Sequence, residues 1–206
     1  LTNTGYIKRV PTDTYRQQRR GGKGVIGMNT KEEDFVEHVF TASTHDYLLC
    51  FTEEGRMYWL KAYQVPEGSR QARGRSLANV LQMSQEEKLA AIICVRKLDD
   101  DEHHLLMATR KGVVKKTLLS AYKNVRVAGI NAIKIDEDDQ LIGVVLTNGD
   151  NDIMLSMKKG KAIRFHEKGA RAMGRVSRGV RGVRLADKDQ VVSIDIVDGA
   201  ASMMAI

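Results

Sequence analysis

Residues 48–61, LLCFTEEGRMYWLK, decide the fold. An apolar run from Leu48 to Phe51 is followed by a short polar turn that ends at Gly55, and an alternating run from Arg56 to Lys61 follows the glycine. An apolar run, a turn containing glycine and a second alternating run are together typical of a β-hairpin. The stretch therefore predicts two antiparallel strands that are joined at Gly55.

The same arrangement recurs along the 206-residue chain. A glycine followed by apolar and cationic residues stands at Gly5, Gly55, Gly112 and Gly160, at spacings of 50, 57 and 48 residues. A second glycine with basic neighbours comes 17 to 19 residues after each of these. An acidic turn and a β-rich run then close each repeat, at residues 34–42, 87–95, 139–146 and 189–197. Each repeat is expected to form about four strands and no substantial helix.

Units of four strands at this period indicate a propeller or a related radial array of blades. Helical periodicity is missing, which argues against a helical solenoid. We therefore expect one all-β domain over residues 1–206, with blades at 1–47, 48–103, 104–151 and 152–199 and the start of a fifth at 200–206. The first unit lacks its opening strand and the last run lacks partners, so the sequence is expected to be a fragment of a longer array.

Positive charge is concentrated in one part of each unit. The chain has 33 Lys and Arg against 26 Asp and Glu, a formal charge of +7. The segments 8–24, 56–75, 108–126 and 156–184 carry +5, +4, +6 and +9, so the remaining residues together carry −17. In a radial array, equivalent positions lie at equivalent places on the rim, and these segments would form one curved basic track. Such a track suits a long polyanion that bends around the outside.

The most basic loop is residues 18–24, QRRGGKG, in which three glycines accompany two arginines and a lysine. This composition favours an exposed loop where main-chain amides and cationic side chains approach phosphates. Few aromatic residues accompany the cations, so duplex-backbone binding is expected rather than single-strand stacking. The candidate DNA contacts are Lys8, Arg9, Gln18, Arg19, Arg20, Gly21, Gly22, Lys23, Gly24, Arg70, Arg73, Arg75, Lys111, Lys115, Lys116, Arg126, Lys161, Arg164, Arg175, Arg178 and Arg181.

Other motifs give no catalytic, metal or cofactor site. Residues 22–27 match G-x-G-x-x-G, but residues 15–20 before them cannot form the buried strand that a dinucleotide fold requires. Residues 99–104, DDDEHH, are expected to be an exposed hairpin tip rather than a metal site. Cys50 and Cys94 lie in apolar runs and are expected to be buried free thiols of a reducing compartment. No apolar run is long enough to span a membrane, so a soluble cytoplasmic protein is expected.

The heptapeptide at residues 18–24 resembles the signature box of the C-terminal domain of the bacterial DNA gyrase A subunit, in the type IIA topoisomerase family. Residues 31–35, 44–51, 109–118, 171–175 and 179–182 are similar to that family as well, so the likeness covers essentially the whole chain. The resemblance implies a β-pinwheel, a propeller-like disc whose blades exchange strands. Six blades are usual in the family, and about four would be present here.

The resemblance also implies a function. Duplex DNA would wrap around the basic rim, and this wrapping would support ATP-dependent negative supercoiling by an A2B2 assembly with the gyrase B subunit. No cofactor is expected in this domain, because ATP and Mg²⁺ would act elsewhere in the parent complex, in the cytoplasm at the bacterial nucleoid. Two alternatives stay open: the corresponding domain of the topoisomerase IV A subunit, and a propeller scaffold that binds an acidic protein.

Overall fold

The computed structural model describes residues 1–15, 17–22, 24, 26–30, 34–84, 86–124 and 126–197. Within this part of the chain nearly all regular structure is β-strand, and the one α-helix, α1, has four residues. No helix in these ranges is long and apolar enough to cross a membrane. The elements in order are β1 (Tyr6–Ile7), η1 (Thr12–Thr14), β2 (Tyr47–Thr52), β3 (Arg56–Lys61), η2 (Ala62–Gln64), β4 (Arg75–Ser76), α1 (Leu77–Val80), β5 (Leu89–Val95), β6 (His104–Thr109), β7 (Val113–Leu118), η3 (Leu119–Tyr122), β8 (Ile130–Asn131), β9 (Leu141–Thr147), β10 (Asp152–Met157), β11 (Ala162–His166), η4 (Glu167–Gly169), β12 (Val180–Arg181) and β13 (Val191–Val197).

The three hairpins expected from the sequence are confirmed. β2 pairs with β3, β6 with β7 and β10 with β11, in each case antiparallel. The turns contain Gly55, Gly112 and Gly160, which have φ values of 79°, 83° and 78°. A residue with a β-carbon adopts this left-handed conformation only at a cost, which explains why a glycine recurs at the start of each alternating run.

The closing run of each of the last three units is also a strand, as expected. β5, β9 and β13 pair antiparallel with β2, β6 and β10, the first strands of their own hairpins. The corresponding strand expected in the first unit, within residues 34–42, is wrong: only an isolated bridge between Thr2 and Val36 forms there. A closing run needs the strand before the opening glycine as its partner, and here that position is held only by residues 1–4.

Each unit lends a short strand to the sheet of the unit before it. β8, from the third unit, completes the sheet β5–β2–β3–β8, and β12, from the fourth, completes β9–β6–β7–β12. β4, from the second unit, pairs with β1 of the first, while β11–β10–β13 forms a three-stranded sheet. The units are therefore linked by strand exchange, and the fold is an all-β propeller-like array.

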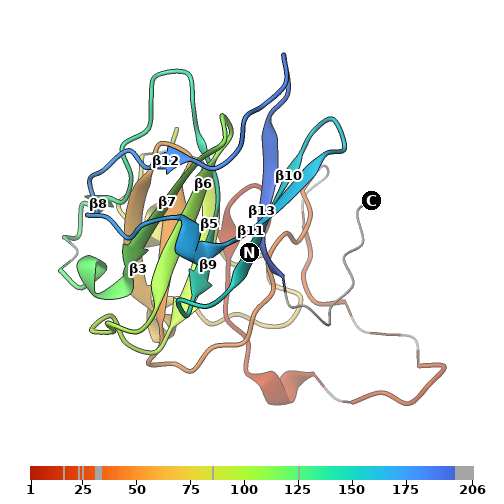
Figure 1. The fold of residues 1–206 in the computed structure, drawn as a ribbon. Coiled ribbons are helices and arrows are strands. Elements are labelled where there is room, and N and C mark those ends of the chain that lie inside the picture. The colour runs from red at the N-terminus through yellow and green to blue at the C-terminus, as the bar shows by residue number, and fades with distance from the viewer. Residues whose placement is uncertain are drawn as a thin grey trace.

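Successive sheets pack face to face and enclose apolar cores between them (Figure 1). One core joins Leu49, Phe51 and Met57 of the second unit to Leu105, Met107, Leu119 and Tyr122 of the third. Another joins Leu106 and Val114 to Ile153 and Leu155 of the fourth unit. Strand β9 lies against both β5 and β13. In Figure 1 the red N-terminal segment with η1 extends away from these sheets at the lower edge of the view.

Two glycines with positive φ allow the exchanged strands to approach their neighbours closely. At Gly129 (φ 75°) a β-carbon would lie 2.7 Å from the ring of Tyr58, and at Gly179 (φ 108°) it would lie 2.6 Å from the carbonyl oxygen of Val114. Glycine removes both the backbone strain and the collision. The second glycine of each repeat therefore fixes the place where one unit joins the sheet of the preceding unit.

Candidate nucleic-acid interface

The basic loop of residues 18–24 is exposed and is held by its own glutamine. The Gly22 amide donates to the Arg19 carbonyl over 3.0 Å, and the Gly24 amide donates to the Gln18 side-chain oxygen over 2.9 Å. Gly21 and Gly24 have φ values of 90° and 70°. The Arg19 and Arg20 side chains are exposed, while Lys23 lies outside the described residues. The loop thus presents two arginines, and Gln18 shapes the loop through its amide oxygen.

The other candidate residues divide into three groups by burial. Lys8, Arg9, Arg70, Arg73 and Arg175 are half-buried, and Lys115 and Lys116 are buried. Exposed long cations lie in every unit, which is what a continuous basic track along the array requires. The exposed group, besides Arg19 and Arg20, comprises Arg75, Lys111, Arg126, Lys161, Arg164, Arg178 and Arg181.

Arginines from three successive units meet around one hollow. Arg56 of the second unit, Arg126 of the third and Arg175 of the fourth line a cavity of about 530 Å³, together with Asn124, Gly129, Ile130, Asn131 and Val176. No carboxylate is among these lining residues. Guanidinium groups match the geometry of phosphate oxygens, so the hollow suits a phosphate of a nucleic-acid backbone.

Arg56 was missed in the sequence-based set of candidates. It directly follows Gly55, as the candidate Lys161 directly follows Gly160, and this shared register was the signal that could have identified it. Its guanidinium donates to the Ala128 carbonyl over 2.5 Å and lies 3.5 Å from the Glu87 carboxylate. Arg175 donates to the Asn131 carbonyl over 3.0 Å. Main-chain contacts therefore hold two of the three arginines at the hollow.

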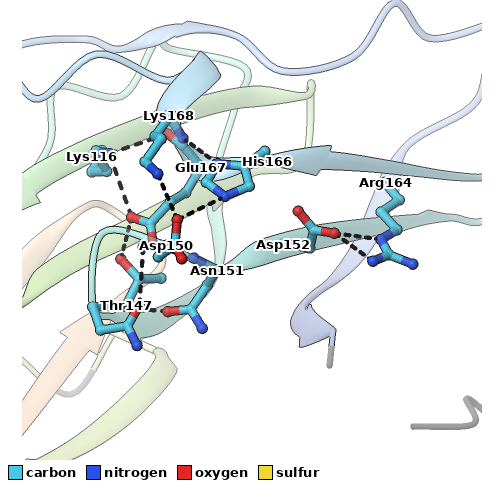
Figure 2. Close-up of polar contacts among 10 residues, drawn as sticks. Lys116, Thr147, Asp150, Asn151, Asp152, Arg164, His166, Glu167 and Lys168 are labelled. Atoms are coloured by element: carbon cyan, nitrogen blue, oxygen red, sulfur yellow. Dashed lines mark hydrogen bonds and ion pairs between the residues drawn. The ribbon is translucent and has the colours of Figure 1, made fainter. Parts of the chain in front are cut away.

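Several candidate arginines are paired with carboxylates at the surface. Arg164 contacts Asp152 at 2.5 Å (Figure 2), Arg178 contacts Asp136 at 2.5 Å, and Arg9 contacts Glu67 at 2.8 Å. Exposed pairs of this kind contribute about 0–1 kcal/mol to stability. A phosphate can therefore compete for these arginines. Arg73 stacks over the Tyr6 ring, with 4.6 Å between the guanidinium carbon and the ring centroid.

The structure corrects the expectation that Lys115 and Lys116 face an external polyanion. The Lys115 side chain is fully buried, and its ammonium group donates to the main-chain carbonyls of Ala132 and Arg175. Burial, with the nearby Arg175 charge in addition, lowers the pKa of Lys115 to about 7. An ammonium group that is enclosed by protein carbonyls has no free face for a phosphate.

Lys116 lies in a buried network with Glu167, shown in Figure 2. Its ammonium group lies 3.4 Å from the Glu167 carboxylate and donates to the Glu167 carbonyl over 3.1 Å. The carboxylate also accepts from the Thr147 hydroxyl at 2.8 Å and the Asn151 amide at 2.9 Å. Burial acts to raise the pKa of Glu167, but these hydrogen bonds and the Lys116 charge outweigh it, so the pKa lies below the ordinary value. The pair joins the third unit to the fourth.

The acidic segment 99–104 is not the hairpin tip expected from the sequence, because it connects β5 and β6, which belong to different sheets. The Asp100 carboxylate is buried and accepts from the Glu102 and His103 amides, each over 2.9 Å. Hydrogen bonding from the His103 amide is the main reason that the pKa of Asp100 falls to about 2. This carboxylate organises the loop, and no cluster of three or more potential metal ligands occurs in the described ranges.

The exchanged strands, the face-to-face sheets and the basic rim define the class of the protein: an all-β propeller-like domain with a cationic edge. A sequence profile of the family described as "DNA gyrase C-terminal domain, beta-propeller" matches residues 1–43, 46–96, 103–148 and 153–198. The chain belongs to this family.

Known proteins are similar over most of the chain. It is 50% identical to the DNA gyrase A subunit of Clostridium acetobutylicum over 88% of its length, and 44% identical to that of Escherichia coli over 99%. It spans only 22% and 23% of these relatives. Among solved structures, the topoisomerase IV C-terminal domain has a TM-score of 0.80 at 28% identity, covering 97% of this chain and 60% of that one. The DNA gyrase A C-terminal domain has a TM-score of 0.75 at 26% identity, covering 96% and 63%.

Proposed function

We propose that this chain is a non-catalytic module that binds duplex DNA and wraps it around the basic rim of the array. The observation that carries the proposal is the hollow lined by Arg56, Arg126 and Arg175, one arginine from each of three successive units. Groups that bind phosphate on one unit alone would clamp DNA at a point. Groups shared between units instead follow the curve of the array, which favours a bent duplex.

The affinity of such a module comes from the phosphate backbone. Each phosphate that Lys or Arg neutralises releases condensed counterions, which favours binding and makes the affinity depend on salt. The exposed arginines of the 18–24 loop and of residues 126, 178 and 181 have no base-reading geometry of their own. We therefore propose binding that tolerates many sequences and selects DNA that bends easily.

The proposed setting of this module is a larger enzyme, of which the chain is the C-terminal part of the gyrase A subunit. That polypeptide would assemble with gyrase B in the bacterial cytoplasm at the nucleoid. ATP and Mg²⁺ would act in the parent complex, and the wrapped DNA would supply the handed crossing that ATP-driven strand passage converts into negative supercoils. The expected blade limits, 1–47, 48–103, 104–151 and 152–199, remain part of this proposal.

The salt dependence of DNA binding tests the proposal. For a long duplex, log affinity against log salt is expected to fall linearly, with a slope of about −0.9 for each phosphate neutralised. Replacing Arg19, Arg20 and Lys23 together by alanine is expected to make the slope shallower by about 2.7 if each contacts one phosphate.

The contrary outcome is also defined. A scaffold for an acidic protein would bind duplex DNA weakly at low salt and would depend on particular apolar residues of the surface. A salt slope near zero, or a slope that the triple alanine variant leaves unchanged, would therefore contradict DNA binding through the 18–24 loop.

A further inference from the structure

Two lysines occupy the same register position in the first and third units. Lys8 is the third residue after Gly5, and Lys115 is the third residue after Gly112. Both stand among the candidate DNA contacts, and in both cases the structure turns the ammonium group toward the protein. Their contacts are closely similar.

Lys115 links its own unit to the next one. Its ammonium group donates to the carbonyl of Ala132, in its own unit, and to the carbonyl of Arg175, in the fourth unit. Ala132 is three residues after Gly129, the glycine at the exchanged strand, and Arg175 is four residues before Gly179. The Tyr122 hydroxyl also donates to the Ala132 carbonyl, over 3.2 Å.

Lys8 repeats this geometry at the junction of the first and second units. It donates to the Gly27 carbonyl over 3.0 Å, to the Ser69 carbonyl over 3.0 Å and to the Arg70 carbonyl. Gly27 is three residues after Gly24 and Arg70 is four residues before Gly74. Both acceptor positions therefore match those of Lys115, although the two junctions share few identical residues.

We propose that Lys8 and Lys115 are tethers that position the basic loop of the following unit, and that they do not contact DNA. Each holds the main chain at an arginine, Arg70 or Arg175, whose side chain remains free to face a phosphate. The inference rests on the proposed DNA binding, since the positioned loops carry part of the basic rim.

The other two units show why a lysine is used where it is. The same register position is Tyr58 in the second unit and Ile163 in the fourth. Tyr58 packs its ring against Gly129, and its hydroxyl donates to Glu87. In the third unit, whose loop Tyr58 meets, the two glycines are 17 residues apart, whereas they are 19 apart in the units whose loops Lys8 and Lys115 hold. The longer loops receive an ammonium group, which can bond to several carbonyls at once.

The contacts of Arg175 connect the tether to the rim. Its carbonyl accepts from Lys115, its guanidinium donates to Asn131, and it lines the hollow with Arg56 and Arg126. Without the tether, the main chain at Arg175 loses one of the contacts that fix it. The guanidinium is then no longer held at the distance from Arg126 that two neighbouring phosphates require.

The first test needs no DNA. Hydrogen exchange is measured on Lys115→Met and Lys8→Met, which keep most of the side-chain volume and remove the ammonium group. Lys115→Met is expected to speed exchange several-fold in residues 173–177 and to leave 68–72 unchanged, and Lys8→Met is expected to do the reverse. Lys111→Met is the matched control, because this exposed lysine lies in the same hairpin as Lys115 and its nearest acidic partner is Asp138. Exchange that is unchanged in both loops would overturn the proposal.

The second test separates a tether from a DNA contact. Both variants are expected to keep the salt slope of the unaltered chain and to reduce the bending of a duplex that carries a fluorescent donor and acceptor at its ends. A slope that becomes shallower by about 0.9 for either lysine would show a phosphate contact and overturn the proposal. Lys8 is half-buried, so Lys8→Met decides the question if Lys115→Met does not fold. If the unaltered chain shows no salt-dependent binding, the proposed function fails, whereas the exchange result still stands.

Discussion

Replacing Lys116 by methionine tests whether this lysine is structural, as its burial indicates. Its side chain is 8% exposed and that of Glu167 is 0% exposed, so the change leaves a carboxylate in the interior without its cation. Removing one partner of a buried ion pair costs about 3–5 kcal/mol. The Thr147 hydroxyl and the Asn151 amide still bond to the carboxylate. We therefore expect a loss near the lower end, about 3 kcal/mol of unfolding free energy.

Urea unfolding followed by circular dichroism measures this loss, and two further variants make it interpretable. Lys168→Met is the matched control, since Lys168 pairs with Asp150 over 2.6 Å at the surface and is 69% exposed, and its loss is expected to be below about 1 kcal/mol. In Lys116→Met/Glu167→Gln the buried charge is removed as well, so part of the stability is expected to return. A loss for Lys116→Met no larger than for Lys168→Met would refute the buried-pair reasoning.

The other predictions concern pH and backbone conformation. Because the pKa of Lys115 is lowered in the fold, unfolding takes up a proton above about pH 7, and stability is expected to rise from pH 7 to 9 by at most about 1.4 kcal/mol per pH unit relative to Lys115→Met. The pKa of Glu167 is lowered instead, so its contribution is present above pH 4.5 and is lost on acidification; the stability difference between the unaltered chain and Lys116→Met should narrow below that pH in the same unfolding experiment. Gly179→Ala introduces a β-carbon 2.6 Å from a carbonyl oxygen at a φ of 108° and is expected to lower the melting temperature by several degrees, whereas Gly174→Ala, with open space around it, is not.

The hairpins and closing strands were predictable because period-two alternation and turn glycines are local signals. The runs that became β5, β9 and β13 were recognised from their apolar and β-branched content alone. The exchanged strands β4, β8 and β12 were not placed, since each has only two residues and its partner lies in another unit. The run 34–42 shows the opposite failure, where a strand-like composition lacked a partner to pair with.

The buried lysines show where sequence reasoning about the interface ended. Successive residues of a strand point to opposite faces, so at least one of Lys115 and Lys116 was expected to reach solvent. In this array β7 is covered on both faces, by the loop of Arg175 on one and by Glu167 on the other. Both lysines are therefore buried, and only the arrangement of neighbouring units could reveal it. The hollow of Arg56, Arg126 and Arg175 depends on the same arrangement.

The central claim is that the array wraps duplex DNA, and the linking number of closed circular DNA tests it most directly. Relaxed nicked circles are incubated with the chain, sealed by ligase, and separated by gel electrophoresis after the protein is removed. The account predicts a positive shift in linking number that grows with protein concentration and is abolished when Arg19, Arg20 and Lys23 are replaced by alanine. Saturated binding that leaves the linking number unchanged would contradict wrapping and would reduce the chain to a clamp on the DNA backbone.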